Sequence, residues 1–213
     1  MDIVLILLEG AVVTLKIAVG SWILSIVLGL LLGAIHDLGS GVARGIVHAV
    51  VTVLRSMPQL VVLYLLYFGI GAFGLNVPPT IAAVLALGVT DAAFTSEYYR
   101  AALMTVSPSQ REAGASIGLS PFGVFRRVVL PQALPFAVPP ILNSFISLLK
   151  VATLAAAVGS PEILYRAQSL MQVTGEITIV ITIVIALYIG ITVPLSRAVG
   201  VLERRIGASS RST

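Results

Sequence analysis

The chain has 213 residues, of which 58% are hydrophobic and only 10% are charged, and its mean hydropathy is +1.06. An ordinary soluble domain carries charge on about a quarter of its residues, so this composition excludes that class and indicates a membrane protein. The formal charge of +4 comes from arginines that form no basic face with stacking aromatic residues, and cysteine is absent, so neither a nucleic-acid partner nor a thiolate metal site is expected.

The chain begins with a predicted lead-in to the membrane. In residues 2–16, Glu9 and Lys16 are seven positions apart and share one face of an amphipathic helix. The first three residues lack the basic leader of a removable signal peptide. We therefore expect residues 2–16 to form a helix that lies on or enters the membrane.

Five apolar stretches follow, and a helix needs about 20 such residues to cross the hydrocarbon core. Glycines around position 40 mark a break after the first stretch, and residues 42–54 are expected to form an interfacial helix before the second. The stretches are continuous rather than alternating with a period of two, so helices are favoured over the strands of a β-barrel. The predicted spans lie at about 17–35, 57–74, 79–96, 132–158 and 177–196.

Arginine is distributed unevenly among the segments that join these spans. Segments 36–56, 97–127 and 197–213 hold ten arginines, whereas the alternate segments 1–16, 75–78 and 159–176 hold only Lys16 and Arg166 as basic residues. Because loops rich in Lys and Arg stay in the cytoplasm, the sequence predicts an external N-terminus and a cytoplasmic C-terminus.

A short polar segment between the third and fourth spans is the most distinctive feature of the chain. Ser107-Pro108 is a helix-start signal, and Gly118 fits a left-handed helix end. Ser120-Pro121 then begins a second short helix, so a helix-turn-helix is expected to project from the membrane. The small residues 113–115 would let a partner approach closely. The alternative is an ordinary charged loop that caps two spans.

This segment resembles the EAA loop of importer-type ABC permeases, written E-A-A-x3-G-x9-I-x-L-P. The spacing matches throughout, and the departures are Gly114 for the second alanine and Val128 for the isoleucine. The resemblance to the polar amino-acid branch (HisMQ-like) runs from about residue 11 to 205. It is carried by the segments 55–60, 66–69, 97–100, 130–133, 139–140, 148–150 and 202–205.

The resemblance implies an all-α integral membrane protein with five transmembrane helices and the type I ABC importer permease (MetI-like) fold. The expected organisation is an N-terminal lead-in at 1–10, a permease domain at 11–205 with its coupling loop at about 107–131, and a disordered cytoplasmic tail at 206–213. The expected location is the bacterial inner (plasma) membrane. The residues implied to couple the chain to an ATPase are Glu112, Ala113, Gly114, Gly118, Leu130 and Pro131.

The resemblance also implies the partners. Such permeases pair as homo- or heterodimers in membrane lipid, bind two cytoplasmic ATPase subunits, and receive a polar amino acid or a close analogue from an extracytoplasmic solute-binding protein. The cargo then moves inward across the dimer interface. This chain lacks a G-x-x-x-x-G-K-[ST] loop, so ATP hydrolysis is expected from a separate subunit, and no cofactor is expected in this chain.

Two charges fall inside predicted spans, where an unpaired charge is costly, so both are candidates for the substrate pathway. Asp91 lies near the middle of the third span and Lys150 in the outward half of the fourth. Together they suit the ammonium and the carboxylate of a zwitterion. The alternative is that they pair with each other or with the second subunit. The family often has an acidic residue after this lysine, and Val151 stands there instead.

Other signals favour structural roles. Glu97 and Arg100 have the i,i+3 spacing of a structural ion pair rather than a gate. Four prolines are expected to break or bend the start of the fourth span, and the resulting kink is expected to face the pore. Gly29-x-x-x-Gly33 allows close helix packing. The prolines are Pro131, Pro135, Pro139 and Pro140.

Glycines 69, 71 and 74 match a dinucleotide fingerprint but follow a membrane span. His36 and His48 have no ligand partners.

Three other functions compete with the importer permease. An ion-coupled secondary transporter of small polar solutes predicts a longer chain or an inverted repeat, and neither is visible. A membrane-embedded enzyme predicts a clustered nucleophile and base, which the sequence lacks. A scaffold without transport would have no neighbouring genes for an ATPase and a binding protein.

Overall fold

The computed structural model describes residues 2–209, with side chains described to residue 204, and every regular element in this part of the chain is a helix. Four helices are long and apolar enough to cross a membrane, and a bent pair, Gly41–Ser56 with Gln59–Ala72, adds a fifth crossing if it counts as one span. The elements are α1 (Ile3–Leu38), α2 (Gly41–Ser56), α3 (Gln59–Ala72), α4 (Pro79–Met104), α5 (Pro108–Ser116), α6 (Pro121–Val124), η1 (Phe125–Val129), α7 (Leu130–Val151), η2 (Ala152–Val158), α8 (Ile163–Thr174) and α9 (Ile177–Ser209).

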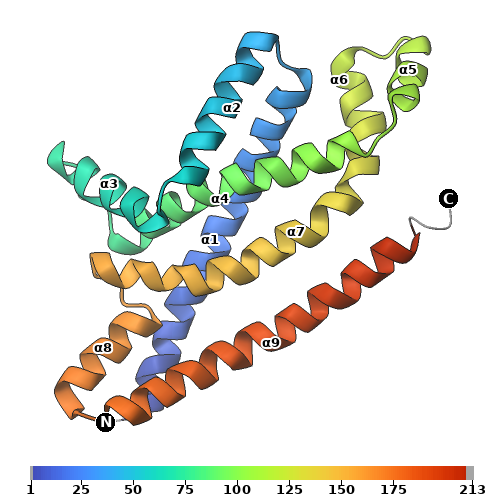
Figure 1. The fold of residues 1–213 in the computed structure, drawn as a ribbon. Coiled ribbons are helices and arrows are strands. Elements are labelled where there is room, and N and C mark those ends of the chain that lie inside the picture. The colour runs from blue at the N-terminus through green and yellow to red at the C-terminus, as the bar shows by residue number, and fades with distance from the viewer. Residues whose placement is uncertain (1, 210–213) are drawn as a thin grey trace.

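The helices form an elongated bundle with two distinct ends (Figure 1). The start of α1, helix α8 and the start of α9 gather at one end. Helices α5 and α6 and the end of α9 lie at the other. The segment 107–131 is thus far from the segment 159–176, as the two opposite sides of a membrane require.

The lead-in helix and the first span form one helix rather than two. Helix α1 runs for 36 residues, from Ile3 to Leu38, and Gly39 is its C-cap. The carboxylate of its N-cap Asp2 accepts the Val4 N–H at 3.2 Å. At the far end of the chain, α9 continues through Ser209, so the helix includes the first residues of the predicted tail. Residues 210–213 of that tail lie outside the described residues.

Helices α1 and α4 pack so closely that α1 needs glycine at their contact. A Cβ on Gly29 would lie 2.7 Å from Thr95 Cγ2, and one on Gly33 would lie 3.0 Å from Tyr99 Cβ. The predicted close packing at Gly29-x-x-x-Gly33 is confirmed, and α4 is the partner helix.

The second span differs from its prediction. Helix α2 is not a separate interfacial helix, because Val47 and Val51 are buried with Ala93 between α1 and α4. Met57 is extended before Pro58, as proline requires, and α3 leaves at 101° to α2. The straight span expected at 57–74 is therefore the second half of a bent pair that starts at Gly41. This packing also places Arg55 over the Phe94 ring at 5.2 Å, rather than in a loop.

The proline-rich start of the fourth span contains a π-helical turn. In η1 the Leu130 N–H bonds to the Phe125 carbonyl, five residues back. Pro131 has no N–H, and its ring would clash with the carbonyl four residues before it, so a wider turn accommodates it. The chain changes direction between α6 and α7 (Figure 1), as the prolines predicted. It continues as helix through Pro135, Pro139 and Pro140.

Candidate functional site

Helices α5 and α6 form a projecting corner at one end of the bundle (Figure 1). Pro108 begins α5, and Gly118 has the left-handed φ of +82° that ends it. The Ser120 hydroxyl then accepts the Gly123 N–H at 3.2 Å and caps α6. The predicted helix-turn-helix is confirmed, and each boundary uses the residue that the sequence indicated.

The small residues of α5 divide between two faces. Ala113 and Ala115 are exposed, as is Glu112, and are open to a partner. Gly114 is buried instead, because a Cβ there would lie 3.2 Å from Val124 Cγ2 and 3.3 Å from Val128 Cγ2. The absence of a side chain at Gly114 therefore lets α5 pack against the chain's own α6 and η1, rather than letting a partner approach.

Two large apolar side chains are exposed on this corner, and neither belongs to the residues that define the sequence motif. Ile117, at the end of α5, is 77% exposed, and Phe122, in α6, is 60% exposed. Nothing in the described part of the chain covers them. A helix corner outside the apolar spans gains by burying such groups against a protein partner.

A salt bridge anchors the corner to the bundle. The Arg111 guanidinium donates to the Asp37 carboxylate at 2.9 Å and to the Leu103 carbonyl at 3.2 Å. Asp37 belongs to the last turn of α1, and Leu103 to the last turn of α4. The corner is thus tied to both of the helices that form the centre of the bundle, a link that sequence spacing did not indicate.

The remaining residues of the motif lie in the stem below the corner. Leu130 packs at the edge of a buried cluster that includes Val124, Phe125 and Val129, whereas Pro131 is exposed at the start of α7. The nine-residue spacing between Gly118 and Val128 therefore spans one short helix and the π-helical turn.

Asp91 lies where three helices meet. It is 6% exposed, and its Oδ2 accepts hydrogen bonds from Ser25 of α1 at 2.6 Å and from Ser144 of α7 at 3.1 Å. Thr95 of α4 adds a weaker contact at 3.4 Å, and the Ser25 and Thr95 hydroxyls lie 2.7 Å apart. The carboxylate cross-links α1, α4 and α7 through hydroxyl groups.

Lys150 lies elsewhere. It is exposed in the last turn of α7, on the same face as exposed Asn143 and Ser147, and no carboxylate lies within salt-bridge distance of it among the described residues. The two intramembrane charges are therefore not joined within one chain. Lys150 belongs to a polar stripe on an open helix face, and Asp91 belongs to the interior. Asn143 itself donates to Glu203 of α9 at 2.9 Å.

Glu97 and Arg100 form the expected ion pair. The guanidinium contacts Glu97 Oε2 through Nη2 at 2.6 Å and through Nε at 2.8 Å. Both groups belong to one helix, so the pair stabilises α4 itself rather than bridging two moving parts.

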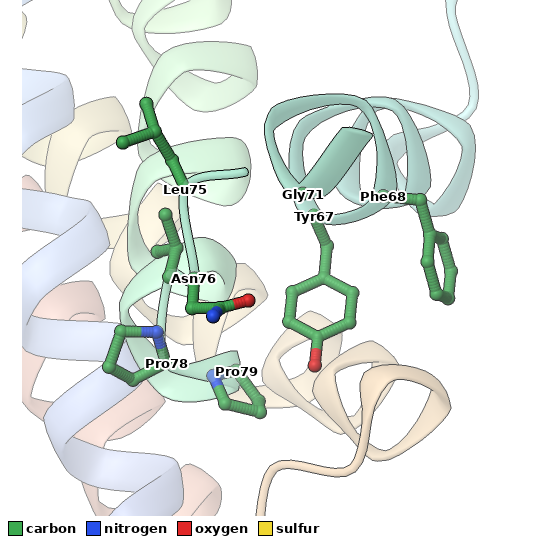
Figure 2. A pocket seen from close by; sticks show the side chains of 8 residues that line it. Tyr67, Phe68, Gly71, Leu75, Asn76, Pro78 and Pro79 are labelled. Carbon is green, nitrogen blue, oxygen red and sulfur yellow. The ribbon is translucent and has the colours of Figure 1, made fainter. Parts of the chain in front are cut away.

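An open cavity of about 590 Å³ lies between α3 and the start of α4 (Figure 2). Figure 2 shows the Tyr67 ring and the Asn76 side chain turned toward this space, with Pro78 and Pro79 forming one wall. No charged residue lines it. The cavity is therefore poorly suited to hold both charges of a zwitterion, and the glycine pattern at 69–74 beside it is the end of a helix rather than a nucleotide-binding turn.

A buried acid at the opposite end of the molecule was not indicated by the sequence. Glu162 caps α8 by accepting the Tyr165 N–H at 2.8 Å, and it is fully buried. Its second oxygen and the Tyr188 hydroxyl of α9 are the buried side-chain atoms without a hydrogen-bond partner in the described part of the chain. Burial raises the pKa of Glu162 to about 7.

Comparison with known proteins places these features in context. Residues 25–208 match the family described as "Binding-protein-dependent transport system inner membrane component". The chain is 36% identical over 160 residues to the probable glutamine ABC transporter permease protein GlnP of Bacillus subtilis (strain 168), covering 75% of this chain and 73% of that protein.

Two further similarities extend over nearly the whole chain. The L-cystine transport system permease protein TcyB of Bacillus subtilis (strain 168) is 32% identical over 202 residues, which cover 94% of this chain and 86% of that protein. The fold is similar to one described as "Crystal structure of an amino acid ABC transporter with histidines", with a TM-score of 0.83, 29% identity and 94% of each chain covered.

Proposed function

The chain belongs to the family of inner-membrane components of binding-protein-dependent transport systems, and from this premise we propose how it takes part in transport. It is a multi-pass permease subunit of an ABC importer and not a catalytic enzyme. We infer that its cargo is a polar amino acid or a close analogue, because similar permeases are named for glutamine and cystine and a similar solved structure is an amino acid transporter. The cargo moves inward across an interface between two permease subunits.

We propose that the α5–α6 corner is the contact with a separate ATPase subunit, which hydrolyses the ATP. Exposed Glu112 and Ala113 are available to a partner, and Ile117 and Phe122 offer the apolar surface that a cleft would bury. Gly118 sets the turn between the helices. Leu130 and Pro131 belong to the stem that carries the motion into α7. The link from Arg111 to Asp37 would pass a displacement of α5 to α1 rather than let it dissipate in the loop.

We propose that the substrate pathway follows the polar stripe of α7. Lys150 supplies the cation for a substrate carboxylate, and Asn143 and Ser147 supply hydrogen-bonding groups on the same face. Asp91 contributes from behind this face, where its bonds to Ser25 and Ser144 hold α7 against α1. A second permease subunit, identical or related, would close the pathway opposite this stripe.

The proposed orientation puts the α5–α6 corner in the cytoplasm and α8 outside. The arginine distribution supports it, since Arg44, Arg111, Arg126 and Arg127 lie in elements at the corner's end of the bundle, whereas α8 at the other end holds Arg166. The external end would then receive substrate from an extracytoplasmic binding protein. The C-terminus follows α9 to the cytoplasmic side.

The observation that carries the function is the family match over 25–208 joined to the projecting corner that this family's motif predicts. The test is reconstitution of the chain in proteoliposomes with the ATPase subunit that co-purifies with it, followed by uptake of radiolabelled polar amino acids. ATP-dependent uptake of at least one amino acid is the expected result. Uptake that follows an ion gradient without ATP would instead establish secondary transport.

A further inference from the structure

A second, smaller cavity lies at the end of the bundle that carries the α5–α6 corner. Its volume is about 200 Å³, and it opens between the last turn of α1, the first turn of α2 and the last turn of α4. Four of its seven lining residues carry a charge or titrate. The lining residues are Gly33, His36, Asp37, Arg44, Arg100, Leu103 and Met104.

The charges around this cavity leave one guanidinium without a carboxylate. Arg100 is paired with Glu97 at 2.6 Å, and Arg111 is paired with Asp37 at 2.9 Å. Arg44 is exposed, and among the described residues its side chain donates only to the Gly39 carbonyl, at 3.3 Å. Three guanidiniums therefore face two carboxylates, so the mouth of the cavity carries a net positive charge.

Exposed apolar side chains occur at the same level of α1 and α2 as the cavity, on helix faces that point away from it. Ile35 and Leu38 on α1 are 42% and 39% exposed, and Val42 and Ile46 on α2 are 75% and 60% exposed. Met104, on the cavity wall, is 72% exposed. These apolar faces indicate that this level of α1 and α2 borders lipid. The small cationic cavity thus lies at the membrane surface, at the depth where the long helices α1 and α4 end.

We propose that this cavity binds the phosphate headgroup of an anionic phospholipid. The Arg44 guanidinium provides a planar fork that matches phosphate oxygens. Its partner among the described residues is a neutral carbonyl that a phosphate readily replaces. The acyl chains leave the cavity past the exposed side chain of Met104 and enter the surrounding lipid. Basic cavities between helices at the cytoplasmic surface recognise anionic lipid in this way. The position of this cavity at the membrane surface favours a lipid headgroup over a soluble anion. The bound lipid lies beside the Asp37–Arg111 link, at the base of the α5–α6 corner.

Native mass spectrometry of the detergent-solubilised full chain tests this site without requiring transport. Phosphatidylglycerol and phosphatidylcholine are titrated separately, and glycerol 3-phosphate is added as a soluble competitor. We expect selective retention of phosphatidylglycerol that Arg44→Gln lowers by about tenfold, the effect of losing one charge-assisted hydrogen bond. Met104→Glu should lower it as well, because the added carboxylate repels phosphate. Arg197→Gln, an exposed arginine on α9 away from the cavity, should leave it unchanged.

Three outcomes would overturn the proposal. Equal loss in the Arg44→Gln and Arg197→Gln variants would mean diffuse surface charge rather than a site. Displacement of the lipid by glycerol 3-phosphate would mean that the cavity takes small soluble phosphates. Equal retention of both lipids by the unaltered chain would mean that the headgroup charge is not recognised. Folding of each variant is checked by its monodisperse elution, and Met104→Glu keeps the test decisive if Arg44→Gln does not fold.

Discussion

Asp91 and Lys150 are both charges in lipid-spanning helices, and their surroundings give them different roles. Asp91 is buried and accepts hydrogen bonds from hydroxyl groups of three helices. These bonds offset the free-energy cost of burying its carboxylate within the chain. Lys150 is exposed on α7 without a carboxylate among the described residues. The first residue holds helices together, and the second is open to a ligand.

Replacing these two residues should therefore give opposite results. Asp91→Ala removes the acceptor that three buried hydroxyls share and should destabilise the permease by about 1–3 kcal/mol. The KM of the remaining uptake should change less than about twofold. Lys150→Gln should leave thermal stability unchanged and raise the KM about tenfold or more, because a charge-assisted hydrogen bond to the substrate carboxylate is lost. Thermal melting in detergent and uptake kinetics in proteoliposomes measure the two effects. An Asp91→Ala variant of normal stability with a raised KM would place Asp91 in the substrate site.

Glu162 makes the docking of α8 depend on pH. Its folded-state pKa of about 7 lies above the ordinary value of 4.5, so the folded chain holds a proton that the detached segment releases. Stability should therefore fall as pH rises from about 4.5 to about 7, by on the order of 3 kcal/mol at most, and stay constant above that. The groups around it on α1, α8 and α9 are Thr14, Tyr165, Tyr188 and the pair of Arg166 and Glu9, which lie 2.8 Å apart.

Hydrogen exchange of the α8 amides between pH 5 and pH 8 reports this docking, after correction for the intrinsic pH dependence of exchange. Protection should decrease with pH in the unaltered chain and should be independent of pH in the Glu162→Gln variant, which keeps the shape and cannot ionise. A pH dependence that persists in Glu162→Gln would assign the titration to another group. The neighbouring change Arg166→Gln removes a partly exposed charge and should leave the pH dependence in place.

At the scale of elements, the corner of α5 and α6 combines a rigid inner face with an open outer one. Gly114 allows the inner contact with Val124 and Val128, and Arg111 ties the corner to α1. Ala113, Ile117 and Phe122 remain exposed on the outside. A corner of this kind moves as a body, because its internal contacts are packed before any partner binds.

Gly114→Leu should separate ATP hydrolysis from transport. The Cβ of the new side chain would already lie 3.2 Å from Val124 Cγ2 and 3.3 Å from Val128 Cγ2, which is closer than ordinary van der Waals contact. The rest of the leucine side chain does not fit there, so α5 must shift away from α6. We expect uptake to fall about tenfold or more while membrane insertion and basal ATPase activity persist. The matched control is Gly45→Leu, since a Cβ at Gly45 meets no atom within 4 Å. Normal uptake in Gly114→Leu would mean that the packing of this corner does not serve coupling.

At the scale of the whole molecule, α5 and α8 lie at opposite ends of the bundle, so they are expected on opposite sides of the membrane. If one end is cytoplasmic, the other is external (Figure 1). The bent pair α2–α3 does not alter this, because α4 returns to the end that carries α5. The arginine count selects the corner as the cytoplasmic end.

Labelling of single cysteines tests that choice directly, because the chain has no cysteine of its own. Val173 in α8 is 77% exposed, and Ser116 at the end of α5 is exposed. In spheroplasts, a membrane-impermeant maleimide should label the Val173→Cys variant and spare Ser116→Cys. Inverted vesicles stripped of ATPase subunits should show the reverse. Labelling of Ser116→Cys from outside would contradict the proposed orientation and with it the contact to a cytoplasmic ATPase.

Local chemistry made several features predictable from the chain alone. A helix satisfies its own backbone in lipid, so apolar runs are enough to predict helical spans. Ser-Pro pairs and Gly118 set the ends of α5 and α6 through their own dihedral preferences, and Glu97 meets Arg100 because three residues make almost one turn. The interior surroundings of Asp91, the burial of Gly114, the packing of α2 and the link from Arg111 to Asp37 all join residues that are distant in sequence or face one another across helices. Only the tertiary structure decided these, because no local rule sets which faces of two helices meet.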